Sequence, residues 1–258
     1  MRLYTGTHQP HWLWTVSRVA RPDVWWFLNH ARLLGGSPSM TLGRALYWWG
    51  CDSGAYMRLK LRGGWEAYAV AEYLEAVYRY VDEIGRMKFA APCDWPCDGL
   101  SLTATNLSVL EHQHRTVENF LEFRDLAPEL PFIPVLQGWE PGDYLRHLDM
   151  YAEAGVDLEA ESLVGVGSVA TTDRQRRPEI QALFRELASG GLRMHGFGLK
   201  EPGLALGAVY ILLSIGLSLT LVAMEPIWSR LLLVVLSVLL IAANIDTVRR
   251  VSRLASTK

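Results

Sequence analysis

Two aspartates and one glutamine stand in short segments whose residue types could do chemistry. The segments are Cys51-Asp52-Ser53-Gly54-Ala55-Tyr56, Ala91-Pro92-Cys93-Asp94-Trp95-Pro96-Cys97 and Val135-Leu136-Gln137-Gly138-Trp139. An aspartate accepts paired hydrogen bonds or transfers a proton, and a glutamine amide both donates and accepts. Taken singly, an Asp-Ser or Asp-Trp-Pro step more often caps a helix or closes a turn. The chemistry therefore depends on whether the fold brings these side chains together.

Cysteine and histidine residues offer a competing interpretation as a zinc site. Cys93 and Cys97 are followed by His112 and His114, which superficially form a set of two Cys and two His ligands. A single residue separates the two histidines, whereas zinc sites usually separate them by about three to five. With Cys51 the chain has three cysteines, too sparse and odd a set for a disulfide framework. We therefore expect a reducing compartment, no metal and no cofactor.

The elements that would position these side chains alternate along the chain as strands and helices. Helical spacing of apolar residues predicts helices over 65–84, 108–126, 141–154 and 178–188, the third with Pro141 in its first turn. Apolar runs predict seven strands, over 2–5, 24–28, 45–49, 87–91, 132–136, 163–166 and 194–198. This alternation is typical of an α/β fold with a largely parallel sheet.

Polar residues follow the ends of the middle strands. Asp52 comes after the third predicted strand, Asp94 after the fourth and Gln137 after the fifth, and residues 165–168 close the sixth. In a barrel such ends converge on one mouth, where active sites lie. Periodicity alone does not separate a barrel from an open doubly wound sheet. The placement of the polar residues favours a TIM-type (βα) barrel that is incomplete, because seven strands are predicted.

The order of these segments resembles that of the tRNA-guanine transglycosylase superfamily. They are followed by Gly165-Val166-Gly167-Ser168 and by His195-Gly196-Phe197-Gly198-Leu199-Lys200, which is similar to the family's strand-seven segment. The resemblance is greatest to the branch implicated in 7-deazaguanine modification of DNA, in which a segment like Glu111-His112-Gln113-His114-Arg115-Thr116-Val117-Glu118-Asn119 recurs. It covers residues 1–200 and implies exchange of a guanine or 7-deazaguanine base in DNA or tRNA.

The resemblance also implies roles for individual residues around the base. Asp94 would accept from the donor-rich edge of the purine, and Gln137 would supply an amide to the carbonyl side. Gly165 and Gly167 would let the backbone approach the flat ring, because no side chain stands in the way. Asp52 would be the catalytic carboxylate, transferring a proton or positioning the ribose.

Aromatic and basic residues complete this expected site. Trp95, Trp139 or Tyr56 would stack on a flipped base, although tryptophans are more often core anchors. Three arginines of a polar loop after the sixth strand would hold phosphates, unless that loop is merely solvated: Arg174, Arg176 and Arg177.

One part of the family pattern is missing. Base exchange needs a carboxylate that attacks the anomeric carbon, and in the family this nucleophile follows the seventh strand. Here Lys200 and Glu201 lead directly into an apolar run, and Asp246 lies beyond it. Three explanations stay open: a membrane-tethered binding protein that retains the base pocket, use of Asp52 as a substitute nucleophile, or loss of a C-terminal unit by truncation, frameshift or fusion. The open seventh strand would need a cover, from a partner chain in a homo-oligomer or from the apolar segment.

The apolar run itself predicts a membrane hairpin over 203–245. Residues 203–224 carry no charge and reach the roughly 20 residues that span a bilayer. Residues 231–245 approach spanning length together with 227–229, and Glu225 and Pro226 form the turn. The alternative is a pair of buried core helices. Basic residues before the first and after the second run predict that a domain over 1–200 and the tail of the 201–258 segment both face the cytoplasm.

Charge limits how the chain could meet a nucleic acid. The net charge is -2, and residues 201–258 hold five of the 25 Lys and Arg and three of the 27 Asp and Glu, which leaves -4 on residues 1–200. No global basic field attracts DNA or tRNA, so such a contact must use a local patch.

Overall fold

The computed structural model describes residues 3–7, 9–15, 24–34, 42–170 and 177–198. The chain divides into two units, Met1–Leu199 and Lys200–Lys258, and every described residue belongs to the first. The hairpin predicted over 203–245 therefore lies outside the described residues. Within the described part, no helix combines the length and the apolar character needed to cross a membrane.

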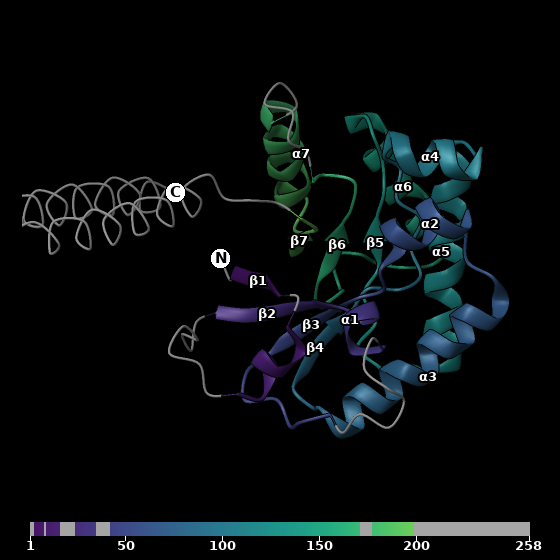
Figure 1. Ribbon diagram of the computed structural model, residues 1–258. Helices are drawn as coiled ribbons and strands as arrows, with labels where there is room; N and C mark the ends of the chain where they lie inside the picture. Colours follow the sequence, from purple (N-terminus) through teal and green to yellow (C-terminus); the bar gives the residue numbers. More distant parts are fainter. Residues whose placement is uncertain (1–2, 8, 16–23, 35–41, 171–176, 199–258) are drawn as a thin grey trace, which may run out of the picture. The chain divides into compact units, whose positions relative to one another are not determined.

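Seven strands form in the described residues, and all their ladders are parallel. One sheet has the order β1 (Leu3–Thr7), β2 (Val24–Asn29), β3 (Trp49–Asp52) and β4 (Met87–Ala90). A second has the order β5 (Val135–Leu136), β6 (Val164–Val166) and β7 (Met194–Gly196) (Figure 1). A parallel bridge between Ala90 and Phe132 extends from the end of β4 toward the segment before β5. The predicted parallel α/β fold is confirmed.

The helices follow the strands as the alternation predicts. The four predicted helices are present as α3 (Ala67–Glu83), α5 (Val109–Leu126), α6 (Pro141–Glu153) and α7 (Arg177–Ser189). Pro141 does stand in the first turn of α6, where its missing N–H costs nothing. Four short elements were not predicted, because they span too few residues to show a period: η1 (Pro10–Leu13), α1 (His30–Leu34), α2 (Ala55–Arg62) and α4 (Gly99–Thr105).

The prediction of the third strand was wrong in its position. The apolar run 45–49 only approaches the sheet, and Leu46 and Trp48 keep 44% and 37% of their surface exposed. The strand proper begins at Trp49 and pairs its last residue, Asp52, with Asn29 of β2. Asp52 thus belongs to the tip of a strand, which fixes its backbone more firmly than a loop position would.

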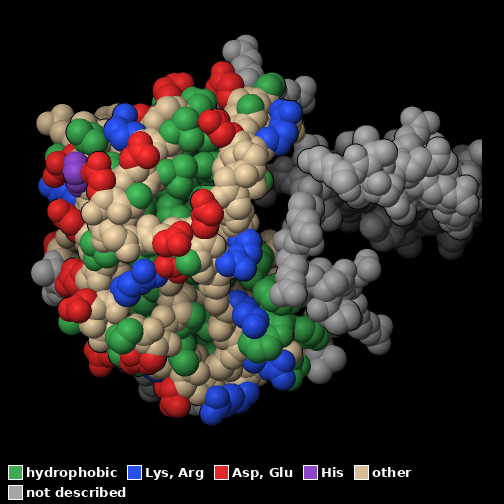
Figure 2. Space-filling model, turned by 180° about the vertical axis from the view of Figure 1, so that it is seen from behind, with side chains coloured by type: hydrophobic (Ala, Val, Ile, Leu, Met, Phe, Trp, Pro, Cys, Tyr) green, Lys and Arg blue, Asp and Glu red, His purple; other side chains and the backbone are tan. Residues whose placement is uncertain are grey.

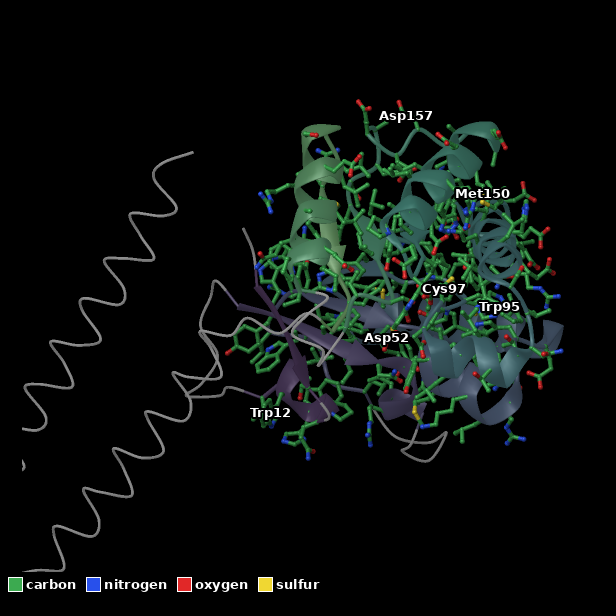
Figure 3. All side chains as sticks on the ribbon, turned by 90° about the horizontal axis from the view of Figure 1, so that it is seen from above. Trp12, Asp52, Trp95, Cys97, Met150 and Asp157 are labelled. Atoms are coloured by element: carbon green, nitrogen blue, oxygen red, sulfur yellow. The ribbon has the colours of Figure 1, made fainter. Side chains whose placement is uncertain are left out.

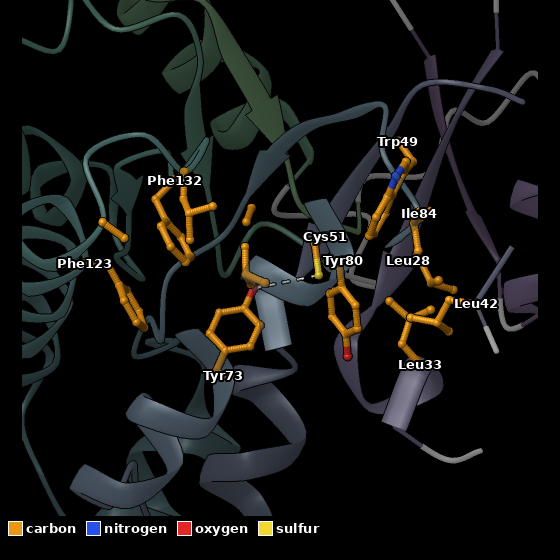
Figure 4. Packing of buried hydrophobic residues seen from close by; sticks show 14 of the residues in the cluster. Leu28, Leu33, Leu42, Trp49, Cys51, Tyr73, Tyr80, Ile84, Phe123 and Phe132 are labelled. Atoms are coloured by element: carbon orange, nitrogen blue, oxygen red, sulfur yellow. Dashed lines mark hydrogen bonds between the residues drawn. The ribbon is translucent and has the colours of Figure 1, made fainter. Parts of the chain in front are cut away.

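A core of aromatic and aliphatic side chains anchors the carboxyl ends of β3 and β4 against α3 (Figure 4). The hydroxyl of Tyr73, in α3, donates to the backbone oxygen of Ala91 at 2.8 Å and also contacts the Cys51 sulfur. Phe123 of α5 stacks on Phe132 with 4.5 Å between ring centroids. Burial raises the pKa of the Cys51 thiol far above its usual value, so this cysteine serves as a core residue rather than a nucleophile.

A second aromatic cluster joins the two sheets. The centroid of the His195 ring, in β7, lies 5.0 Å from the ring centroid of Tyr4 in β1, 5.1 Å from that of Phe27 in β2 and 5.2 Å from that of Phe89 in β4. Phe197, just after β7, stacks on Phe27 at 5.6 Å. Side chains of the last strand therefore pack on the inner face of the first sheet. No ladder joins β7 to β1 among the described strands, so closure into a TIM-type barrel remains a prediction.

Candidate functional site

A cavity of about 760 Å³ lies at the carboxyl ends of the strands. This volume falls within the range of small-molecule sites and exceeds that of a single flat base. In parallel α/β sheets ligands bind outside the carboxyl ends of the strands. The polar lining comes from the segments that end or follow β2 to β6: Asn29, Asp52, Asp94, Asp98, Gln137 and Ser168.

The structure brings Asp94 and Gln137 into direct contact. The Gln137 Nε2 donates to Asp94 Oδ2 at 2.6 Å, and the Ser53 hydroxyl donates to Asp94 Oδ1 at 3.1 Å. Asp94 and Gln137 are both buried, with 4% and 1% of their surface exposed, and both line the cavity. A carboxylate and an amide thus stand side by side at one wall, as recognition of a heterocycle edge requires.

Gln137 is hydrogen-bonded at all four of its polar atoms. Its backbone N–H donates to His147 Nδ1 at 2.8 Å, and its backbone oxygen accepts from Gln113 Nε2 at 2.7 Å. Its side-chain Oε1 accepts from the Ser168 hydroxyl at 2.8 Å, and its Nε2 bonds to Asp94. Burial lowers the pKa of His147 to about 3, so the ring stays neutral and can accept through Nδ1. The amide is therefore fixed before any ligand arrives.

One face of α5 holds the loop that carries Asp94. His112 Nδ1 donates to the Pro96 oxygen at 2.7 Å, Thr116 Oγ1 accepts from the Trp95 N–H at 2.9 Å, and Asn119 Nδ2 donates to the Cys93 oxygen. The three helix residues follow the spacing of a single helical face. The family-like segment 111–119 thus supports the loop on both sides of Asp94, which sequence analysis did not foresee.

Asp52 is held by its own turn and by the neighbouring strand. Its Oδ1 accepts from the Gly54 N–H at 3.2 Å, and its Oδ2 accepts from Asn29 Nδ2 at 2.8 Å. Asn29 is itself oriented by the Ala31 N–H, which donates to its Oδ1 at 2.9 Å. Burial raises the pKa of Asp52, while the two hydrogen bonds act in the opposite direction. The carboxylate faces the same cavity as Asp94.

The environment of Asp94 brings the pKa of its carboxyl close to neutrality. Burial raises its pKa to about 7, and the nearby negative charge of Asp52 adds to this increase. Hydrogen bonds from Gln137 and Ser53 favour the ionised form and limit the shift. At neutral pH both protonation states are therefore accessible, a property that is common among catalytic carboxyls.

The two predicted glycines serve different purposes. A Cβ on Gly167 would lie 2.2 Å from Gln137 Nε2, so only glycine allows the amide to occupy its place on the cavity wall. Gly165 does not line the cavity, and a Cβ there would lie 2.8 Å from the Phe197 ring. Its role is to admit that ring against β6.

The predicted aromatic residues are also divided. Trp139 and Tyr56 line the cavity, and Tyr56 is 41% exposed at its rim. Trp95 is buried outside the lining, edge-on to His112 and beneath the Arg115 guanidinium, 4.7 Å from the ring centroid. Figure 3 shows Trp95 and Asp52 as separate positions in the domain. The structure therefore places Trp95 as a packing residue, and of the three rings predicted to stack on a base only Trp139 and Tyr56 line the cavity.

The structure does not describe the side chains of the three arginines predicted to bind phosphate. Arg174 and Arg176 lie outside the described residues, and Arg177 begins α7 with a side chain that is not described. No Lys or Arg occurs among the described residues of the cavity lining. Figure 2 shows acidic and basic side chains interspersed over one face of the domain.

The cysteine and histidine residues do not form the alternative zinc set in the described part of the chain. No group of three or more potential ligands gathers there. Cys93 and Cys97 are buried free thiols. Both ring nitrogens of His112 are engaged, one by the Pro96 oxygen and the other by the Thr105 hydroxyl at 2.7 Å.

The sequence did not single out four polar residues of the site, among them Asp98, which lines the cavity and caps α4. Ser53 and Ser168 were quoted only as parts of motifs, although each hydroxyl orients a cavity side chain. Asn29 was overlooked because the second strand was ended at residue 28. Extending that strand by one residue places Asn29 at a strand tip, directly opposite Asp52, where the rule that found Asp52 would also have found it.

Comparison with known families identifies the class of protein to which this fold and pocket belong. The chain is a member of a tRNA-guanine transglycosylase-like family. That family is DpdA, described as DeoxyPurine in DNA protein A, and its model matches residues 1–221. No curated protein and no solved structure matches. The expected resemblance is thus confirmed at the level of the family, and the match continues beyond residue 200 into the first apolar run.

Proposed function

We propose that this chain binds a guanine or 7-deazaguanine base in the cavity and exchanges it with a base in DNA. The observation that carries the proposal is the contact between Asp94 and Gln137 on the wall of that cavity. Membership of a family named for deoxypurines in DNA favours DNA over tRNA as the nucleic acid.

The donor and acceptor pattern of the pocket suits a guanine edge. An ionised Asp94 can accept from the N1–H and the 2-amino group of guanine through lone pairs that Ser53 and Gln137 leave open. The second hydrogen of the Gln137 amide can donate to the 6-oxo group. A base within a duplex must be flipped out to reach such a pocket, and Trp139 and Tyr56 offer aromatic surfaces to it.

Asp52 is the carboxylate that would act at the sugar. In the proposed step its oxygen attacks C1′ of the deoxyribose, the C1′–N9 bond breaks with its electron pair on the departing base, and that base takes up a proton. The incoming base then loses its N9 proton, and N9 displaces the Asp52 carboxylate from C1′. Two displacements preserve the configuration at C1′, as in retaining glycosidases. Asp98, the other carboxylate near the mouth, is already committed to capping α4.

A second candidate is a protein that binds the base without exchanging it. The sequence lacks the family's aspartate after the seventh strand, and this favours the second candidate. The arrangement of Asn29 and Gly54 around Asp52 favours chemistry, because two donors hold an ionisable group toward the cavity.

Incorporation of radiolabelled guanine into duplex DNA and into tRNA tests the proposal. Wild type is expected to label DNA, whereas Asp94→Ala and Asp52→Asn are expected to reduce labelling by at least about 100-fold, since each removes a charged group from the reaction. Binding of 7-deazaguanine by a wild type that labels neither nucleic acid would instead establish the non-catalytic candidate.

The same proposal includes the barrel architecture, the membrane attachment and the phosphate-binding loop. The aromatic cluster that joins β7 to β1, β2 and β4 supports a TIM-type barrel arrangement with an open seam after β7, which a second copy of the chain would cover. Attachment to the cytoplasmic membrane through 203–245 and phosphate binding by the 174–177 loop rest on the sequence alone. Sedimentation of the full chain with membranes tests the attachment.

A further inference from the structure

Ser168 occupies a backbone conformation that serine seldom adopts. It lies two residues after the end of β6 and has a φ of 55°, in the left-handed region. For a residue with a Cβ this region is energetically unfavourable. Such strain persists where surrounding contacts enforce it, and it is concentrated at functional sites.

Two hydrogen bonds hold the Ser168 hydroxyl. The Cys97 N–H donates to Ser168 Oγ at 2.7 Å, so the oxygen is already an acceptor. Its single hydrogen is donated to Gln137 Oε1 at 2.8 Å. The oxygen end of the amide is thereby turned toward Ser168, and its Nε2 is turned toward Asp94 Oδ2.

We propose that Ser168 is a positioning residue that fixes the direction of the Gln137 amide, and that this lets the pocket distinguish a 6-oxo purine from a 6-amino purine. The inference rests on the proposed binding of a guanine-like base. In the observed direction the amide offers a hydrogen to the ligand. Turned by 180° it would offer its oxygen, which accepts from a 6-amino group.

Asp94 cannot fix the amide alone. As a carboxylate it requires an N–H from Gln137, but once protonated it can donate to the amide oxygen and accommodate either direction. The pKa of Asp94 is about 7, so both forms are populated near neutral pH. Ser168 favours the same amide direction in both forms, because a reversed amide would take Oε1 away from the hydroxyl hydrogen that Ser168 donates to it.

Glycine at this position removes the hydroxyl and leaves the backbone conformation favourable. Ser168→Gly is therefore expected to fold, because glycine adopts a φ of 55° without strain. Asn106→Gly is the matched control: Asn106 has the same φ of 55° and is exposed at the end of α4. It reports the effect of relieving a left-handed residue without touching Gln137.

The test measures the dissociation constants of 7-deazaguanine and 7-deaza-2,6-diaminopurine by calorimetry on the full chain. The two compounds differ in the substituent at position 6 and at N1, where only the 6-oxo compound carries a hydrogen, and the N1 difference is the same for every variant compared. Wild type and Asn106→Gly are expected to prefer the 6-oxo compound. Ser168→Gly is expected to lose about fivefold to tenfold of that preference, the scale of one hydrogen bond.

Three results would count against these assignments. An unchanged preference in Ser168→Gly overturns the role of Ser168 and leaves the proposed function intact. An equal loss of affinity for both compounds also overturns it, because a merely structural serine would act in that way. Failure of wild type to bind either compound overturns the proposed base binding itself, and the inference falls with it.

Discussion

The two carboxylates of the cavity are held by different means. Asp52 accepts from Gly54, two residues away, and from Asn29 on the adjacent strand. Asp94 accepts from Ser53 at the tip of β3 and from Gln137 at the tip of β5, and α5 binds the backbone of its loop. Asp52 thus has one donor in its own turn and one on the adjacent strand, whereas both side-chain donors to Asp94 come from other segments of the chain.

This difference separates structural from functional explanations of the two residues. An aspartate that accepts from an N–H two residues ahead is a common turn former, so the Gly54 contact alone would not indicate a site. The partners of Asp94 are side chains of other strands, which no turn requires. Burial of this carboxyl costs free energy, and the raised pKa records that cost. The side of the cavity formed by Asp94 and Gln137 therefore provides the stronger evidence for function.

Substitution of each carboxylate in turn is expected to give the largest difference in base affinity between the two residues. Asp94→Ala is expected to weaken binding of 7-deazaguanine by about 100-fold, because a charged hydrogen-bonding partner of the base is lost in a buried site. Asp52→Asn is expected to change the same affinity by less than about threefold, because the proposed role of Asp52 is at the sugar and the free base has none. Calorimetry with the free base measures both. Similar losses in the two variants would show that the carboxylates do not divide their roles.

Because the pKa of Asp94 is raised, the contributions of this carboxyl to base binding and to folding are expected to depend on pH. Only the ionised carboxylate accepts both guanine donors, so affinity for 7-deazaguanine is expected to rise about tenfold from pH 6 to pH 8 around a pKa of about 7. Folding should show the opposite trend. The folded protein holds this proton more tightly than the unfolded chain, so the stability contributed by the protonated group is complete below pH 4 and is lost as pH rises through about 7.

Asp94→Asn serves as the control for both trends, since it cannot ionise. Its affinity and its free energy of unfolding should each lack the component that wild type shows around pH 7. Titration of wild-type affinity with a midpoint near pH 4 would contradict the assignment, because an unperturbed aspartate titrates there.

The sequence predicted the parallel strands and the long helices because their apolar periods extend over many residues. It also predicted that Asp94 and Gln137 would meet, since polar residues at neighbouring strand ends converge in a parallel sheet. It did not locate β3, because the run 45–49 is apolar enough to resemble a strand while it lies partly exposed. It did not separate Trp95 from Trp139, since residue type says nothing of which ring α5 covers. The role of Ser168 could not be predicted from the sequence for a related reason. It depends on Cys97 and Gln137, which only the fold brings together.

The smallest expected effect concerns the support of the Asp94 loop by α5. Thr116→Val keeps the shape of a fully buried side chain but removes the acceptor for the Trp95 N–H. Leaving that N–H unsatisfied is expected to lower the free energy of unfolding by about 1 to 3 kcal/mol and to weaken 7-deazaguanine binding about threefold. Chemical denaturation and calorimetry measure the two quantities.

Thr103→Val provides the matched control on α4. Its exposed hydroxyl donates to the Gly99 oxygen within the helix, and Thr103 itself does not line the cavity, so loss of the hydroxyl is expected to change stability by no more than about 0.5 kcal/mol. If Thr116→Val lost stability while its base affinity and the pH midpoint of binding stayed at wild-type values, α5 would support the fold without setting the position of Asp94. In that case the Ser53 and Gln137 contacts alone would place the carboxylate, and the contrast with Asp52 would reduce to a single donor, the Gly54 N–H that stands beside Asn29 where Asp94 has a second side chain.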